Sequence, residues 1–205
     1  MRAAILGTGL IGTSIALGLR QRVKDIHVVG YDRERAAADV ALKGGALHEV
    51  ARDLASAVKG ADIVILAVPV LAIQKLLGEL DGLLDPDTVI TDTGSSKTEI
   101  MRTAAKVLGS HVGFVAGHPM AGKTEFGPNA AEADLFEGAQ WVIVPSVNAS
   151  ERAITMVTSL AETLGAKALV MDGAEHDAAR IVRELEAVEA HALHLRGVHR
   201  GRRQR

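Results

Sequence analysis

Two short polar segments contain the side chains of this sequence that are best suited to chemistry. Residues 92–97 include Ser95 and Lys97, and residues 118–122 begin with His118. An imidazole with a pKa near neutrality can accept the proton of an alcohol that loses hydride. Ser95 can hydrogen-bond to that imidazole, and Lys97 can bring a positive charge to a substrate carboxylate. We therefore predict His118 and Ser95 as catalytic residues and Lys97 as a substrate-binding residue.

Each polar segment follows a run that predicts a β-strand. Residues 88–91 precede the first segment, and residues 112–117 precede the second. In an open α/β sheet, ligands bind outside the carboxyl ends of the strands. Pro119 also favours an extended backbone at His118, which keeps the imidazole at the tip of its strand. Both segments are therefore expected at one edge of a sheet, facing the same ligand.

A glycine-rich turn near the start of the chain predicts what that ligand is. The turn joins an apolar strand-like run, residues 2–6, to a helical run, residues 13–19. Gly7 permits a tight turn, Gly9 lets backbone amides approach a pyrophosphate, and Gly12 lets the helix lie close to the strand. This order of strand, glycine turn and helix is the context that a dinucleotide-binding fingerprint requires. The predicted cofactor-binding residues of the turn are Gly7, Gly9, Leu10, Ile11 and Gly12.

A carboxylate at the end of the second predicted strand completes the fingerprint. Asp32 follows residues 26–31, twenty residues after Gly12, where it can accept hydrogen bonds from the hydroxyls of an adenosine ribose. A 2′-phosphate would be repelled by Asp32 but attracted by Arg33, and the position of the acid favours NAD over NADP. The predicted cofactor site also contains Asp32, Arg33, Val68 and Pro69.

The sequence as a whole alternates between strand-like and helical runs. This alternation predicts an α/β fold with a doubly wound, mostly parallel Rossmann-type sheet. Hydrophobic residues make up 48% of the chain but aromatic ones only 2%, so the core is aliphatic, as in parallel sheets covered by helices on both faces. We predict a dinucleotide-binding domain over residues 1–172. Residues 173–205 are predicted to form a helix capped by Asp172, followed by a basic tail.

Composition excludes several classes of protein. The chain has no cysteine, which excludes disulfides, thiolate catalysis and cysteine-ligated metals, and its histidines show no metal-ligand spacing. The net charge of −2 gives no attraction to nucleic acid or to an anionic membrane. The longest apolar run, residues 63–73, is too short to span a bilayer. Because the first strand begins at residue 2, we expect no signal peptide and a cytoplasmic protein.

Each candidate residue also has a structural interpretation. His118 can be a structural histidine beside a proline turn, and Ser95 and Thr93 can simply cap the helix that follows them. A lysine in a first helical turn, such as Lys97, is often just solvated. Residues 92–95 also match the Asp-Thr-Gly-Ser string of aspartic proteases, but those enzymes need a second carboxylate on an all-β scaffold. The alternation of strands and helices excludes that scaffold.

Four motifs together resemble the prephenate dehydrogenase family, which includes the arogenate dehydrogenases. They are the glycine turn at residues 7–12, the serine-lysine motif at 91–97, the histidine-proline motif at 117–122 and Glu175-His176-Asp177. The resemblance spans roughly residues 1–180, and the middle two motifs are its most specific part. It implies the NAD-dependent oxidative decarboxylation of prephenate to 4-hydroxyphenylpyruvate, or of arogenate to tyrosine, in tyrosine biosynthesis.

The resemblance also implies roles for single residues. His118 accepts the proton of the substrate hydroxyl in this scheme, and Ser95 orients His118. Lys97 and His176 match family positions near the substrate, and we count both as predicted substrate-binding residues. Judged by its position alone, a histidine near a helix start such as His176 is more often a surface residue.

The end of the chain departs from the family pattern. The family continues beyond the Glu-His-Asp motif into a helical domain that forms a homodimer and helps to enclose the substrate. Here the composition changes to arginine and histidine after Ala179, so we expect residues 173–205 to be a remnant of that domain or a replacement for it. One hypothesis is that the tail from about Arg180 results from a truncation or a shifted reading frame; the competing account is a native basic tail that binds an acidic partner. Other reading frames of the gene with no continuation of the helical domain would exclude the first account.

Two further functions remain open at this point. The chain can be a module that binds NAD without turnover, or a hydroxyacid dehydrogenase or imine reductase of the same fold. The latter families usually place a lysine base in their helical domain and have no need of His118. The sequence also leaves open the choice between prephenate and arogenate as the substrate.

Overall fold

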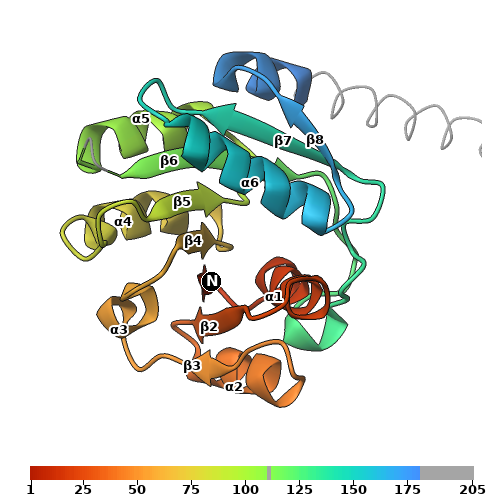
Figure 1. Ribbon diagram of the computed structural model, residues 1–205. Coiled ribbons are helices and arrows are strands. Elements are labelled where there is room, and N and C mark those ends of the chain that lie inside the picture. Colours follow the sequence, from red (N-terminus) through yellow and green to blue (C-terminus); the bar gives the residue numbers. More distant parts are fainter. Residues whose placement is uncertain (110–111, 181–205) are drawn as a thin grey trace, which may run out of the picture.

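The computed structural model describes residues 1–109 and 112–180. Within these residues the strands form one eight-stranded sheet in the order β3-β2-β1-β4-β5-β6-β7-β8 (Figure 1). The strands are β1 (Arg2–Leu6), β2 (His27–Tyr31), β3 (Glu49–Val50), β4 (Ile63–Leu66), β5 (Val89–Asp92), β6 (Gly113–Pro119), β7 (Gln140–Pro145) and β8 (Lys167–Val170). This arrangement confirms the predicted α/β fold with a mostly parallel Rossmann-type sheet. The strand order reverses between β1 and β4, which is where such sheets bind ligands.

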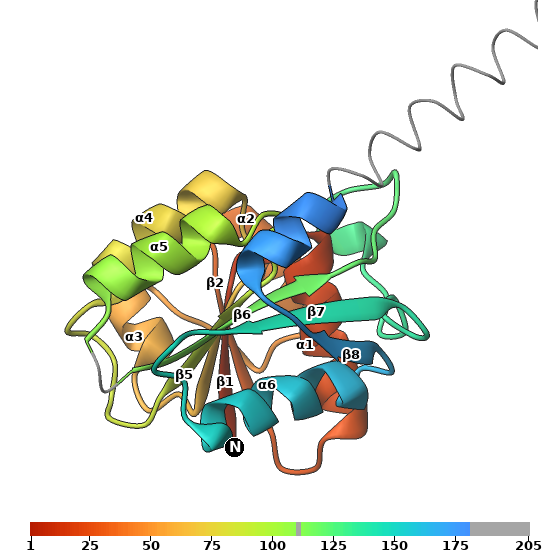
Figure 2. The same ribbon diagram turned by 90° about the horizontal axis from the view of Figure 1, so that it is seen from above.

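Helices cover both faces of the sheet (Figures 1 and 2). They are α1 (Leu10–Arg22), α2 (Arg35–Lys43), α3 (Leu54–Val58), α4 (Val70–Leu80), α5 (Thr98–Val107) and α6 (Glu151–Thr163). Buried side chains of α1, α2 and α6 pack on one face, and those of α3, α4 and α5 pack on the other. All four residues of the central strand β4 are buried, with exposures between 0% and 2%, as expected for a parallel strand covered on both sides.

Strand β7 is the exception to the predicted alternation, because it runs antiparallel to β6, and β8 then runs parallel to β7. In the fully described segment between β6 and β7, residues 123–138 form a loop that contains only a 3-10 helix, η1 (Pro128–Ala130). The loop is held on α1, where the Ser14 hydroxyl accepts a hydrogen bond from the Glu132 N–H at 3.0 Å. A parallel pair needs a crossover connection, which is usually a helix. The chain returns here without one and pairs in the antiparallel direction.

Residues 173–180 are helical, and the helix begins where the sequence predicts. The Asp172 carboxylate accepts hydrogen bonds from the N–H groups of Ala174 at 2.8 Å and Glu175 at 3.4 Å, which caps the helix. The later part of the predicted helix and the basic tail, residues 181–205, lie outside the described residues. Among the helices that are described, none is long and apolar enough to cross a membrane.

Candidate active site

The glycine turn between β1 and α1 is so tightly packed that two of its positions accept only glycine. Gly7 has a φ of +99°, and a Cβ atom there would lie 2.4 Å from the carbonyl oxygen of Ala67. A Cβ atom at Gly12 would lie 1.9 Å from the carbonyl oxygen of Gly7. Gly9 differs, because a Cβ atom there would meet nothing within 4 Å. Gly7 and Gly12 therefore shape the turn, whereas Gly9 faces open space beside it.

A cavity of about 480 Å³ opens beside this turn, between the carboxyl ends of β1, β2 and β4. Its volume lies within the range of small-molecule sites. The first turn of α1 contains no acidic residue and no side-chain cap, so its free N–H groups and positive end are available to a pyrophosphate. Six of the nine predicted cofactor-binding residues line the cavity: Gly7, Gly9, Asp32, Arg33, Val68 and Pro69. Leu10 and Ile11 form the first turn of α1, and these residues together fit a dinucleotide.

Asp32 is held in position at the rim of this cavity. Its Oδ2 accepts hydrogen bonds from the N–H of Thr8 at 2.7 Å and from the Thr8 hydroxyl at 3.0 Å. Its Oδ1 accepts a hydrogen bond from the N–H of Glu34 at 2.9 Å. Arg33 beside it is exposed. Thr8 was not predicted from the sequence. The available signal was that Thr8 is a polar residue inside the glycine turn, and that this turn follows a strand that neighbours the one ending at Asp32.

Replacement of single glycines separates folding from cofactor binding. We expect Gly12→Ala to lower the free energy of unfolding by about 1–3 kcal/mol, because its methyl group overlaps backbone. We expect Gly9→Ala to leave that free energy unchanged, since its methyl group has room, but to weaken NAD binding by about 10-fold where it meets the pyrophosphate. Urea denaturation and calorimetric titration with NAD measure the two effects. A Gly9→Ala variant with wild-type NAD affinity would contradict a pyrophosphate at this turn.

His118 is the second-last residue of strand β6, and His176 from the helix of residues 173–180 packs against it. The Nδ1 atom of His118 lies 2.9 Å from the Nε2 atom of His176, and the two rings meet edge to face with centroids 5.1 Å apart. His118 is half-buried, and His176 is only 3% exposed. The interpretation of His176 as a surface residue is therefore wrong.

The surroundings of His118 keep its imidazole neutral. Burial, followed by the neighbouring His176, Lys97 and Arg180, lowers the pKa of His118 from 6.5 to about 4, and the Asp177 carboxylate opposes the shift. At neutral pH the ring therefore carries one proton and keeps one nitrogen free to accept another.

The lowered pKa of His118 predicts how stability depends on pH. Between its unfolded value of 6.5 and its folded value of about 4, the unfolded chain binds the proton more tightly. Stability contributed by the neutral ring is therefore present above pH 6.5 and is lost as the pH falls toward 4. Urea denaturation at pH 7 and pH 5 should show a smaller loss for His118→Gln than for wild type. The exposed His27→Gln is the control, and an equal loss in all three proteins would contradict the prediction.

Lys97 does not lie where its predicted role requires. Its side chain is fully buried, and its Nζ atom donates hydrogen bonds to Asp92 Oδ2 at 2.5 Å and to the Gly117 carbonyl oxygen at 2.6 Å. Burial lowers the pKa of Lys97, and the Asp92 carboxylate opposes that shift. Lys97 is therefore not placed to meet a substrate carboxylate, contrary to the prediction. The physical reason is that Asp92, buried at the end of β5, needs a counter-charge. The pair joins the end of β5 to β6 immediately before His118.

Ser95 lies on the loop after β5 and is exposed. Within the described residues, no hydrogen bond joins Ser95 to His118, whose Nδ1 is instead engaged by His176. Nor do Ser95 and Thr93 cap α5, because the first N–H groups of that helix are bound by the Asp177 carboxylate. The Ser95 hydroxyl thus remains available at the edge of the sheet where His118 lies.

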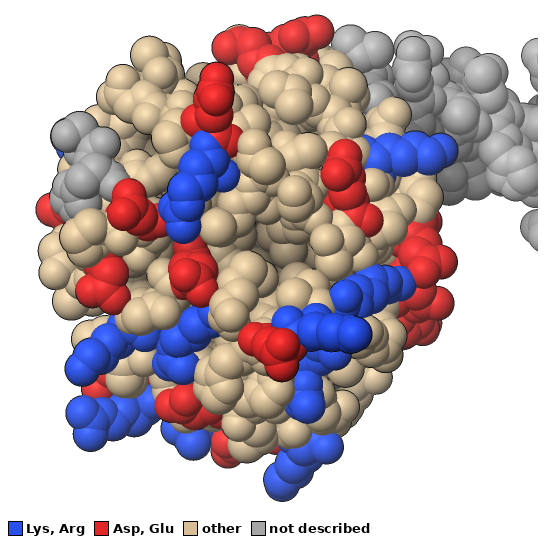
Figure 3. Space-filling model, viewed as in Figure 1, with Lys and Arg blue, Asp and Glu red and all other residues tan. Residues whose placement is uncertain are grey.

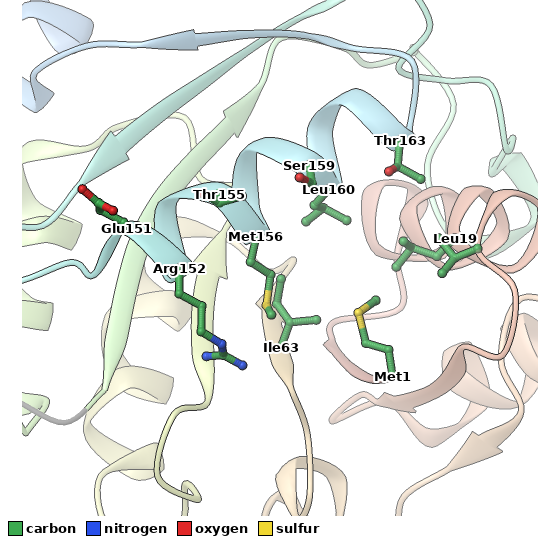
Figure 4. Close-up of a pocket in the computed structure, with 11 residues that line it drawn as sticks. Met1, Leu19, Ile63, Glu151, Arg152, Thr155, Met156, Ser159, Leu160 and Thr163 are labelled. Atoms are coloured by element: carbon green, nitrogen blue, oxygen red, sulfur yellow. The ribbon is translucent and has the colours of Figure 1, made fainter.

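A second cavity lies at the opposite edge of the sheet and offers no comparable chemistry. It measures about 610 Å³ and is lined mainly by uncharged side chains, among them Leu19, Met156 and Leu160 (Figure 4). Arg152 at its rim donates a hydrogen bond to the carbonyl oxygen of Asp87 at 2.7 Å. The surface in Figure 3 carries acidic and basic side chains intermixed around a largely uncharged middle. Because ligands of open sheets bind at the carboxyl edge, we place the active site there.

The sequence is similar to proteins of one family. A family model described as the nucleotide-binding domain of prephenate dehydrogenase matches residues 15–170. The prephenate dehydrogenase of Lactococcus lactis subsp. cremoris is 37% identical over 180 residues, which covers 84% of this chain and 47% of the relative. The chain thus spans about half the length of the curated relatives it matches.

Solved structures point to the same family. The crystal structure of Synechocystis arogenate dehydrogenase matches with a TM-score of 0.81 and 32% identity, over 87% of this chain and 62% of that one. The prephenate dehydrogenase from A. aeolicus, solved in complex with hydroxyphenyl propionate and NAD+, matches with a TM-score of 0.81 and 27% identity, over 86% of this chain and 62% of that one. Since the family model covers more than half of the sequence, the chain belongs to the prephenate dehydrogenase family, through its nucleotide-binding domain.

Proposed function

We propose that this chain binds NAD across the carboxyl edge of its sheet and serves the oxidative decarboxylation of prephenate or arogenate. One observation carries the proposal: a neutral, half-buried His118 lies at the same edge of the sheet as the glycine-lined cavity. A base of this kind is what removal of a hydroxyl proton requires during hydride loss. The names of the relatives, and the NAD+ in the A. aeolicus structure, support the same reaction.

Under this proposal the residues of the cavity hold the two ends of the adenosine diphosphate. The N–H groups at the start of α1, approached over Gly9, bind the pyrophosphate. Asp32 accepts hydrogen bonds from the ribose hydroxyls, and its negative charge at this position disfavours the 2′-phosphate of NADP. Arg33 is free to cover the adenine, and Val68 and Pro69 border the path toward the nicotinamide.

The chain's own residues then provide the proton chemistry. Bound NAD accepts a hydride from the ring carbon that bears the substrate hydroxyl. His118 takes the proton of that hydroxyl, while loss of carbon dioxide leaves an aromatic ring. Ser95, exposed on the neighbouring loop, is placed to hydrogen-bond to the substrate or the cofactor. Lys97 acts indirectly in this scheme, because its ion pair with Asp92 holds the two strand ends that carry Ser95 and His118.

A second candidate function is a module that binds NAD without turnover. The observation that favours it is that the family model that matches residues 15–170 describes the nucleotide-binding domain. In the family, a helical domain beyond the Glu-His-Asp motif helps to enclose the substrate. The described residues themselves contain the cofactor cavity and His118.

Two measurements on the full chain distinguish these functions. Calorimetric titration with NAD and with NADP measures cofactor binding, and the absorbance of NADH measures turnover with prephenate and with arogenate. We expect NAD to bind more tightly than NADP and NADH to form with one of the two substrates. NAD binding without turnover would support the module, and absence of NAD binding would contradict both functions.

A further inference from the structure

Three side chains at the candidate active site form one continuous line of hydrogen bonds. Asp177 Oδ1 lies 2.8 Å from His176 Nδ1, and His176 Nε2 lies 2.9 Å from His118 Nδ1. His176 in the middle of the line is 3% exposed, so water has little access to either of its ring nitrogens. Each of its two nitrogens therefore depends on a protein partner.

Asp177 fixes the direction of these hydrogen bonds, because it stays a carboxylate. Its Oδ1 accepts a hydrogen bond from the N–H of Lys97 at 2.8 Å, and its Oδ2 accepts one from the N–H of Thr98 at 2.9 Å. Burial of Asp177 raises its pKa, but hydrogen bonds from Thr98, Lys97 and His176 outweigh burial and hold the pKa well below its ordinary value. A carboxylate only accepts hydrogen bonds, so the Nδ1 atom of His176 must carry the proton.

The state of His176 then determines the state of His118. A neutral imidazole carries one N–H, so His176 with its proton on Nδ1 has a bare Nε2 that accepts. The facing Nδ1 of His118 must therefore donate, and the Nε2 of His118 is left without a proton. That is the atom at which a base must accept the substrate proton.

We propose that Asp177 is a positioning residue that, through His176, fixes the tautomer of His118 and so presents its bare Nε2 to the substrate. The inference rests on the proposed function for its consequence in turnover, but the tautomers themselves do not depend on it. When His118 takes up a proton, its Nδ1–H already points at His176, with the Asp177 carboxylate beyond. The negative charge of Asp177 stabilises the imidazolium, in the direction of its effect on the pKa of His118. This is the arrangement by which an acid orients a catalytic histidine in other enzymes.

Under this proposal the functional unit extends beyond residue 172. Asp177 lies in the helix of residues 173–180, yet it binds the first N–H groups of α5 and orients the base on β6. The predicted domain boundary at residue 172 would separate Asp177 and His176 from the residue they position.

Nitrogen NMR of isotopically labelled histidine in the full chain tests the tautomers directly, because it shows which ring nitrogen carries the proton. We expect the Nδ1–H tautomer for both His118 and His176, although free histidine prefers the Nε2–H form. In Asp177→Asn we expect His118 to shift toward the Nε2–H form. We also expect kcat to fall by about 10- to 100-fold, with no change in NAD affinity.

Matched variants make the test specific. Glu175→Gln removes the same charge from an exposed neighbour of His176 and should leave tautomers and kcat unchanged. His176→Gln places an amide oxygen near the position of Nε2 and should keep His118 in the Nδ1–H form, whereas His176→Leu should release it. If Asp177→Asn does not fold, these two variants still test whether His176 fixes the tautomer of His118.

The possible failures can be told apart. An Nε2–H tautomer at His118 in the wild-type chain would contradict the proposed relay of hydrogen bonds from Asp177 through His176 to His118. This holds whether or not the chain turns over a substrate. Wild-type tautomers together with wild-type kcat in Asp177→Asn would also overturn the relay. Absence of turnover in a wild-type chain with both Nδ1–H signals would contradict the proposed function and leave the relay supported.

Discussion

Replacement of His118 by asparagine is expected to lower NADH formation with prephenate or arogenate by about 10²- to 10⁴-fold, the contribution typical of general base catalysis. The physical reason is that the neutral ring at the end of β6 is the group placed to take the hydroxyl proton, and asparagine cannot accept one at neutral pH. NADH absorbance under saturating NAD measures the effect. Calorimetry should show unchanged NAD affinity, because the glycine-lined cavity is built from β1, β2, β4 and α4.

The control for this variant is His27→Asn, which changes an exposed histidine at the start of β2. Its turnover should equal that of the wild type. A His118→Asn variant that keeps full turnover would instead favour the reaction of hydroxyacid dehydrogenases or imine reductases, in which a lysine from a helical domain is the base.

Replacement of Lys97 by methionine is expected to lower the free energy of unfolding by about 3–5 kcal/mol, the cost of leaving one charge of a buried pair without its partner. Both Lys97 and Asp92 are fully buried, and the Asp92 carboxylate also accepts hydrogen bonds from the N–H groups of Gly94 and Gly117. Without the ammonium group, Asp92 must stay charged in an apolar setting or take up a proton. Urea denaturation at pH 7 measures the loss.

A matched exposed pair provides the control. Lys75 and Glu79 on α4 form an ion pair at 3.4 Å with side chains 79% and 46% exposed, so Lys75→Met should cost only about 0–1 kcal/mol. The double variant Lys97→Met with Asp92→Asn should recover part of the loss, because it removes the unpaired charge. If Lys97→Met were tolerated as well as Lys75→Met, the buried pair would not be the structural link between β5 and β6 that we describe.

The sequence predicts the nucleotide site well because its requirements are local. The positive φ at Gly7 and the close backbone approach at Gly12 both belong to a single strand-turn-helix unit. The spacing of glycines in the sequence indicates such steric requirements directly. Asp32 follows from the same unit, since it ends the next strand. The overall α/β fold is equally legible, because buried parallel strands and their helices have distinct patterns.

The sequence does not predict how the polar residues at the other strand ends pair. From the sequence, Lys97 is a candidate to bind a substrate carboxylate, yet in the structure it forms an ion pair with the buried Asp92. Asp177 accepts a hydrogen bond from the N–H of Lys97, although the two residues are 80 positions apart in the sequence. His176 and His118 are 58 positions apart. Contacts at such separations depend on the packing of the C-terminal helix against α5 and β6. The reversed direction of β7 likewise depends on the packing of the preceding loop on α1, and no local sequence pattern predicts that packing.

The most direct test of the proposed reaction is the amount of carbon dioxide released for each NADH formed by the full chain. The measurement uses prephenate or arogenate labelled in the ring carboxylate, together with NAD. Oxidative decarboxylation at His118 predicts equal amounts of labelled carbon dioxide and NADH, both strongly reduced in His118→Asn. NADH formed without release of carbon dioxide would contradict the account, because the chain would then oxidise a hydroxyl without the loss of carbon dioxide that makes the ring aromatic.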